Sequence, residues 1–155
     1  MENKVIEHKK IATDIRLGIV EAVFNAKSGH PGGALSSADI LACLYFDELK
    51  VDVSNPKWDG RDRFVLSKGH AAPALYAVLA QRGFFDESLL LNLRQIGCIL
   101  QGHPDMKHIP GVDMSTGSLG QGISAAVGMA LSAKHFGKDY RVYTVLGDGE
   151  SEEGQ

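Results

Sequence analysis

YRVYTVLGDGESEEGQ, residues 140–155, is the stretch from which the fold is predicted. Residues 142–146 form a β-branched and aromatic run without polar alternation, which is typical of a strand buried on both faces of a parallel sheet. The run ends at Gly147, Asp148 and Gly149. Because open α/β sheets bind ligands at the carboxyl ends of their strands, and glycine lets an anion approach the backbone, Asp148 is a candidate ligand for a hard cation. Gly-Asp-Gly is also a common turn sequence, and that alternative stays open at this point.

The composition of the chain is that of one soluble globular domain. Its 155 residues are 44% hydrophobic and 23% charged, and this length is enough to bury a sizeable core. The formal net charge of -3 gives no reason to expect nucleic acid or an anionic membrane as a partner. No apolar run is long enough to span a bilayer. We therefore expect small molecules or other proteins as partners.

The two cysteines indicate the cellular compartment. Cys43 and Cys98 lie far apart in apolar surroundings, with no CxxC pair and no secretory leader. This usage predicts buried thiols in a reducing compartment, so we expect the protein in the cytoplasm.

Helix and strand signals alternate along the rest of the chain. They predict a helix over about 5–26, a second helix that ends near 49, a strand over 63–67, a helix between Pro73 and Gly83, a helix from Asp86 to about 95, and an alanine- and glycine-rich helix over about 119–136. Ser36 and Asp39 resemble a capping box before the second helix. Residues 104–118 read as a long loop, and a loop of that length in a compact domain is usually functional or mobile. The order of elements predicts an α/β fold with a parallel sheet.

Three Gly-His units stand out in the predicted loops. His30, His70 and His103 each follow a glycine, at points where the backbone is already bent. Neutral imidazoles so placed can move protons and hydrogen-bond hydroxyl groups near pH 7. Three of them converging on one polyhydroxylated substrate or one diphosphate would form a site.

The start of the last predicted helix offers a second ligand-binding feature. Gly117, Ser118, Leu119 and Gly120 would present unpaired backbone N–H groups at the positive end of the helix dipole. Such a helix start is a ready anion site, and phosphate is the natural ligand.

The sequence also resembles the amino-terminal part of a transketolase, and most closely the type encoded as two separate subunits. The resemblance rests on five collinear motifs: SGHPGG at 28–33, RDRFVLSKGHAAPALYA at 61–77, QGHPDM at 101–106, PGVDMSTGSLGQG at 110–122 and GDGESEEGQ at 147–155. Deoxyxylulose phosphate synthases and pyruvate dehydrogenase E1 components share GDG but lack this set of Gly-His-Pro units. The resemblance implies the diphosphate-binding domain of a transketolase over residues 1–155.

The resemblance implies an activity and a cofactor. Transketolases use thiamine diphosphate with Mg²⁺ or Ca²⁺ to move a two-carbon ketol unit from a ketose phosphate to an aldose phosphate. By position, Asp148 would ligate the metal, and Gly149 and His70 would contact the diphosphate. The cofactor loop would be formed by three residues, Gly117, Ser118 and Leu119. His30 and His103 would hold substrate hydroxyls and assist proton transfer.

Two interpretations remain open for Glu153, an acidic residue that follows the GDG sequence. Glu153 matches a glutamate of the family's dimer interface, thought to connect two active sites. It also reads as a solvated member of an acidic tail together with Glu150 and Glu152.

The chain departs from the family pattern after Gln155. The Asn-Asn pair that completes the metal site, and the pyrimidine-binding domain, are not in this sequence. We therefore expect a domain incomplete at its C-terminal side, inactive alone, which needs a complementary C-terminal polypeptide within a homodimer or heterotetramer. The alternative is a non-catalytic structural or assembly module that keeps the histidines without their chemistry.

Overall fold

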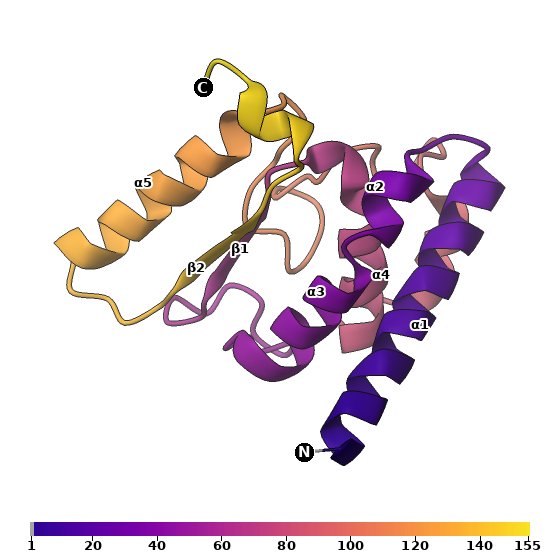
Figure 1. The fold of residues 1–155 in the computed structure, drawn as a ribbon, viewed down its shortest axis with the longest axis horizontal. Helices are drawn as coiled ribbons and strands as arrows, with labels where there is room; N and C mark the ends of the chain where they lie inside the picture. Colours follow the sequence, from indigo (N-terminus) through magenta and orange to yellow (C-terminus); the bar gives the residue numbers. More distant parts are fainter. Residues whose placement is uncertain (1) are drawn as a thin grey trace.

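The computed structural model describes residues 2–155 and has a two-stranded parallel sheet at its centre. Strand β1 spans Arg63–Leu66 and strand β2 spans Val142–Val145, with Phe64 opposite Tyr143. Helix α5, Gln121–His135, covers one face of the sheet, while the other helices lie on the opposite face (Figure 1). The α/β class and the parallel pairing of the two predicted strands are therefore confirmed.

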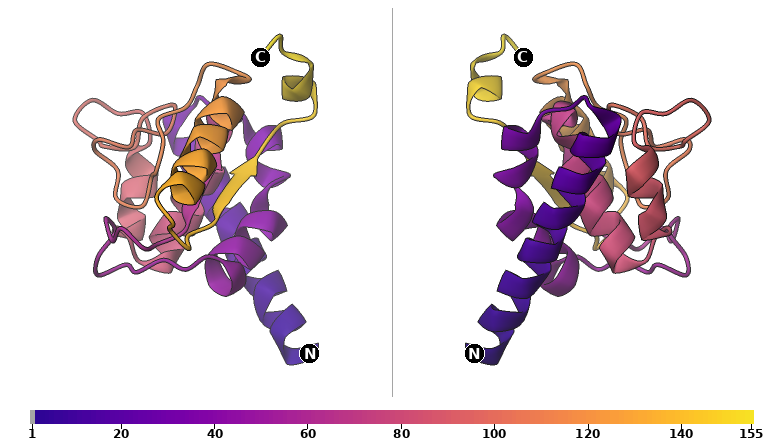
Figure 2. Two further views of the ribbon diagram at one scale, coloured as in Figure 1. Left: turned by 90° about the vertical axis from the view of Figure 1, so that its left-hand side faces the viewer. Right: turned by 90° about the vertical axis from the view of Figure 1, so that its right-hand side faces the viewer.

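The helices opposite α5 form the larger layer. Helix α1, Glu2–Ala26, packs along α3, Ala38–Cys43, and α4, Ala72–Arg82, and the short α2, Pro31–Leu35, sits above α4 (Figures 1 and 2). The remaining elements are a π-helical turn and three 3₁₀ turns: Leu44–Glu48, Gly69–Ala71, Glu87–Asn92 and Gly149–Glu152. Within residues 2–155, no helix is long and apolar enough to cross a membrane.

The core lies between α1, α4 and β1. Ile15 and Ile19 of α1 are fully buried, as the predicted four-residue periodicity requires. Nearly all of α4 is buried as well, so this helix occupies the middle of its layer. Pro73 lies in its first turn and Gly83 ends it with φ at +93°, a conformation that glycine adopts without strain.

Four expectations about local structure are wrong. Strand β2 is only half-buried, because β1 is its one paired neighbour among the described residues. The side chain of Ser36 does not cap α3, since its hydroxyl donates to the carbonyl of Gly33. Asp86 caps a 3₁₀ turn instead of an α-helix. Cys43 is exposed and Cys98 is half-buried, so neither is the buried thiol that the sequence predicts.

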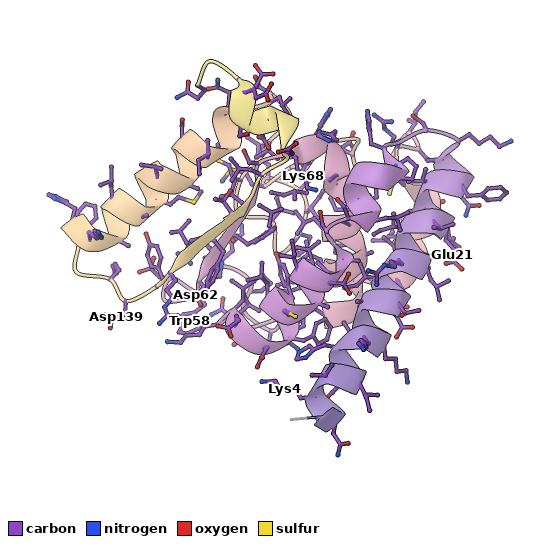
Figure 3. All side chains as sticks on the ribbon, viewed as in Figure 1. Lys4, Glu21, Trp58, Asp62, Lys68 and Asp139 are labelled. Carbon is purple, nitrogen blue, oxygen red and sulfur yellow. The ribbon has the colours of Figure 1, made fainter. Side chains whose placement is uncertain are left out.

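Two buried carboxylates fix the ends of the strands that lie away from the GDG sequence. Asp62 is 2% exposed and accepts hydrogen bonds from the backbone N–H groups of Arg141 at 2.7 Å and Lys50 at 2.9 Å. Asp113 accepts from the N–H of Phe64 at 2.8 Å and pairs with Arg61. Figure 3 shows Asp62 at the lower end of the sheet and Lys68 at its upper end. These contacts set the register of β1 and β2.

Gly122 lets α5 approach β1 closely. A Cβ atom on this residue would lie 2.6 Å from the Cα atom of Ser67, directly after β1. We expect Gly122→Ala to lower the free energy of unfolding by about 1–3 kcal/mol, because the helix must move off the strand. Urea unfolding measures the change.

Gly128 provides the matched control on the same helix. No atom lies within 4 Å of the position that a Cβ would take there, so Gly128→Ala should raise stability by about 0.5–1 kcal/mol through helix propensity alone. Equal losses in both variants would contradict the close approach at Gly122.

Candidate active site at the carboxyl ends of the strands

Three chain segments meet where β1 and β2 end. They are residues 67–70 after β1, residues 147–150 after β2, and residues 117–120 before α5 (Figures 1 and 3). The side chain of Glu150 joins them. Its Oε1 accepts from the hydroxyl of Ser67 at 2.6 Å and from the N–H of Gly120 at 3.0 Å, and its Oε2 accepts from the N–H of Gly147 at 2.9 Å.

The environment of Glu150 corrects the interpretation of this residue as part of a solvated acidic tail. Glu150 is 4% exposed, whereas Glu152 and Glu153 are exposed. Burial raises the pKa of Glu150, but the hydrogen bonds from Ser67, Gly147 and Gly120 outweigh this effect, so the pKa lies below its usual value. The residue is therefore an ionised carboxylate inside the site.

The backbone before α5 is open to an anion. Gly117 and Gly120 have φ at +153° and +83°, and both orient the loop that enters the helix. Within residues 2–155, no protein acceptor takes a hydrogen bond from the N–H groups of Gly117, Ser118 or Leu119. Gly117 and Ser118 line a cleft of about 180 Å³ beside the N-terminus of this 15-residue helix. Unpaired amides and the helix dipole together suit a phosphate group.

His70 lies beside His30, and its ring packs against Gly33. Their ring centroids are 5.2 Å apart in an edge-to-face arrangement, and the Nε2 atom of His70 lies 3.3 Å from where a Cβ on Gly33 would be. Burial lowers the pKa of His70, and the neighbouring His30 and Lys68 lower it further. Its imidazole is thus neutral near pH 7.

His103 reaches the same region from the third Gly-His unit. The hydroxyl of Tyr76 lies 2.8 Å from the carbonyl oxygen of His103 and 2.9 Å from that of Gln101, which anchors the loop to α4. The ring rests against Gly117, where a Cβ would lie 3.0 Å from Cγ of His103. His103 also contributes to the lowered pKa of His70. The structure therefore brings the three predicted histidines together.

Arg94 is a site residue that sequence analysis does not identify. Its Nη1 donates to the hydroxyl of Ser28 at 2.5 Å, and its Nη2 lies 2.5 Å from the position a Cβ on Gly102 would take. Together with His30 and His70 it lines a narrow cleft. Its backbone has φ at +62°, which is uncommon for a residue other than glycine. Arg94 therefore links the first and third Gly-His loops.

Lys68 connects the end of β1 to the first Gly-His loop. Its Nζ donates to the carbonyl of Gly33 at 2.9 Å and to the hydroxyl of Ser36 at 3.2 Å. Burial lowers the pKa of this lysine, although Glu150 opposes the effect. The side chain of this lysine passes Gly147, so its ammonium adds positive potential near the GDG turn for an anionic ligand.

Asp148 and Gly149 are exposed at the end of β2. The main-chain carbonyl of Asp148 accepts hydrogen bonds from the N–H of Ser151 at 3.0 Å and from the hydroxyl of Ser151 at 2.6 Å, which holds the turn in place. Across residues 2–155, no three His, Cys, Asp or Glu side chains gather into a metal site. The exposed carboxylate of Asp148 is the kind of oxygen ligand that a hard dication prefers, and the unpaired amides before α5 suit a diphosphate.

Comparison with known proteins identifies the source of this arrangement. Residues 7–155 match the family model described as transketolase, thiamine diphosphate binding domain. The chain is 49% identical over 155 residues to the 6-deoxy-6-sulfo-D-fructose transketolase subunit SqwG of Clostridium sp. strain MSTE9, and covers 56% of it. It is 49% identical over 154 residues to the transketolase of Homo sapiens and covers 25% of that protein. The chain thus spans about half or less of these relatives.

Solved structures agree with the sequence comparison. The transketolase of Leishmania mexicana superposes with a TM-score of 0.92 at 37% identity, over 95% of this chain and 24% of that one. The transketolase of Campylobacter jejuni superposes with a TM-score of 0.88 at 40% identity, over 95% of this chain and 24% of that one.

Proposed function

Because the chain belongs to the transketolase family, as its thiamine diphosphate-binding domain, we propose that it takes part in transferring a two-carbon ketol unit from a ketose phosphate to an aldose phosphate. The observation that carries the proposal is that His30, His70 and His103 lie close together, with the ring of His103 packed against Gly117 in the loop whose open amides precede α5. A diphosphate and a polyhydroxylated substrate need these two features side by side.

The proposed roles follow from the chemistry of each group. His70, Gly149 and the amides of residues 117–119 bind the diphosphate, and Asp148 ligates the Mg²⁺ or Ca²⁺ that neutralises it. Thiamine diphosphate, when bound, supplies the stabilisation of the carbanion. His30 and His103 hold substrate hydroxyls and transfer protons to and from substrate oxygen atoms.

A second polypeptide is part of this proposal. SqwG is named as a subunit, and so is a relative from the apulose-4-phosphate transketolase of Phocaeicola vulgatus, which is 47% identical over 139 residues. We propose that this chain likewise works in the cytoplasm with a complementary C-terminal transketolase polypeptide, in a homodimeric or heterotetrameric enzyme. Among residues 2–155, β2 pairs only with β1, so its other edge offers backbone groups for further strand pairing.

Reconstitution tests the proposed function. The purified protein is combined with the complementary polypeptide, thiamine diphosphate and Mg²⁺, and transfer from fructose 6-phosphate or 6-deoxy-6-sulfofructose to an aldose phosphate is followed. We expect transfer only when all components are present. Cofactor binding without transfer would favour the non-catalytic assembly module. Condensation of pyruvate with glyceraldehyde 3-phosphate would favour a deoxyxylulose phosphate synthase.

A further inference from the structure

We propose that Glu150 is a positioning residue that holds the metal-binding turn and the diphosphate-binding loop at a fixed separation. The inference rests on the proposed function, because it assigns those two roles to residues 147–149 and 117–119. Glu150 itself needs no contact with the cofactor, since it is 4% exposed and both of its carboxylate oxygens accept hydrogen bonds from the protein.

The hydrogen bonds of Glu150 connect segments that are distant in the sequence. Gly147 is three residues away and directly precedes Asp148, whereas Gly120 is 30 residues away and Ser67 is 83 residues away. One side chain therefore joins the end of β2, the entrance to α5 and the end of β1. A shift of the GDG turn relative to the open amides must break at least one of these bonds.

Both side-chain oxygen atoms of residue 150 must accept a hydrogen bond for this arrangement to form. The N–H groups of Gly120 and Gly147 bond to different oxygens of the carboxylate, and both can only donate. An amide side chain would place its own NH₂ group against one of these donors in either orientation. Hydrogen bonds to a charged group are also the stronger kind, and a buried donor left without an acceptor is costly.

The carboxylate is held by hydrogen bonds and by no direct ion pair. Among the described residues, no Lys, Arg or His lies within salt-bridge distance of Glu150. Lys68, whose pKa Glu150 raises, donates its hydrogen bonds to Gly33 and Ser36 instead. Replacing Glu150 should therefore change the hydrogen bonding of the N–H groups of Gly120 and Gly147.

Glu150→Gln tests the inference, with Glu152→Gln as its matched control. Glu152 lies two residues away, is exposed, and loses the same charge when substituted. In the reconstituted protein with Mg²⁺, we expect Glu150→Gln to raise the Kd for thiamine diphosphate about 10- to 100-fold by calorimetry. At saturating cofactor, kcat should largely recover. Glu152→Gln should leave the Kd unchanged.

Amide hydrogen exchange gives a readout that needs no cofactor. The N–H groups of Gly120 and Gly147 should exchange faster in Glu150→Gln, while core amides of α4 keep their protection. A general loss of fold would instead accelerate exchange everywhere and lower the unfolding midpoint. The weaker variant Ser67→Ala, which keeps both backbone bonds, should fall between the wild type and Glu150→Gln.

Each result decides between the two proposals. An unchanged Kd and unchanged exchange in Glu150→Gln, or equal effects from Glu152→Gln, would overturn the positioning role while the proposed function stands. A wild-type protein that binds no thiamine diphosphate would instead refute the proposed function, and the exchange of Gly120 and Gly147 would still decide whether Glu150 holds the two segments together.

Discussion

Asp148→Asn is expected to weaken Mg²⁺-dependent binding of thiamine diphosphate about 100-fold. Asp148 is an exposed carboxylate in the turn that follows β2, and it is the proposed ligand of the dication. A neutral amide oxygen in its place is a much poorer ligand for a hard dication. Calorimetric titration with cofactor, at a series of Mg²⁺ concentrations, measures the change.

The control for Asp148 is Asp139→Asn. Asp139 is also exposed and loses the same charge, but it precedes β2 and so lies at the opposite end of the sheet (Figure 3). With EDTA present, wild type and Asp148→Asn should bind the cofactor equally weakly. An unchanged Mg²⁺ dependence in Asp148→Asn would show that the metal ligands lie elsewhere.

The elements that sequence analysis places correctly are bounded by local signals. Pro73 and Gly83 mark the two ends of α4 through constraints on their own backbone. The β-branched and aromatic residues of β1 and β2 favour a strand conformation in their own segments. Each of these signals lies within a few residues of the helix end or strand that it predicts. The α/β order follows from them, and parallel pairing follows from that order.

The errors in local structure arise where neighbours decide the outcome. Residues 142–145 have the composition of a central strand, but their burial depends on what pairs beside them. Cys43 has apolar neighbours in sequence, yet it is exposed because it lies three residues after the exposed Ile40, on the face of α3 that points away from the core. Composition alone carries no information on either point.

The residues of the candidate site also fall into two groups, those that local signals reveal and those that depend on distant partners. The three histidines are recognisable because each stands after a glycine, and the amides before α5 because helix starts have a fixed chemistry. The sequence does not reveal the roles of Glu150 and Arg94, because their partners are distant. Ser67 is 83 residues from Glu150, and Ser28 is 66 residues from Arg94. The one local hint is the spacing of Glu150 from Gly147, which lets a side chain fold back onto the strand end.

His103→Ala is expected to lower kcat for ketol transfer by about 10²- to 10⁴-fold, the range typical for loss of a positioned acid or base. The carbonyl of His103 is anchored by Tyr76 and its ring packs on Gly117, so the imidazole is held at the edge of the diphosphate loop. The Kd for thiamine diphosphate should change little, because the loop amides remain. Steady-state transfer kinetics and calorimetry measure the two quantities separately.

The matched control for His103 is His135→Ala, at the far end of α5. His135 is exposed and stacks against Phe136, away from the strand ends, so its loss should leave kcat unchanged. A His103→Ala variant with normal kcat but a raised Kd for thiamine diphosphate would indicate that His103 binds the cofactor and does not transfer protons. A His103→Ala variant with normal kcat and normal Kd would show that the His103 side chain contacts neither the substrate nor the cofactor.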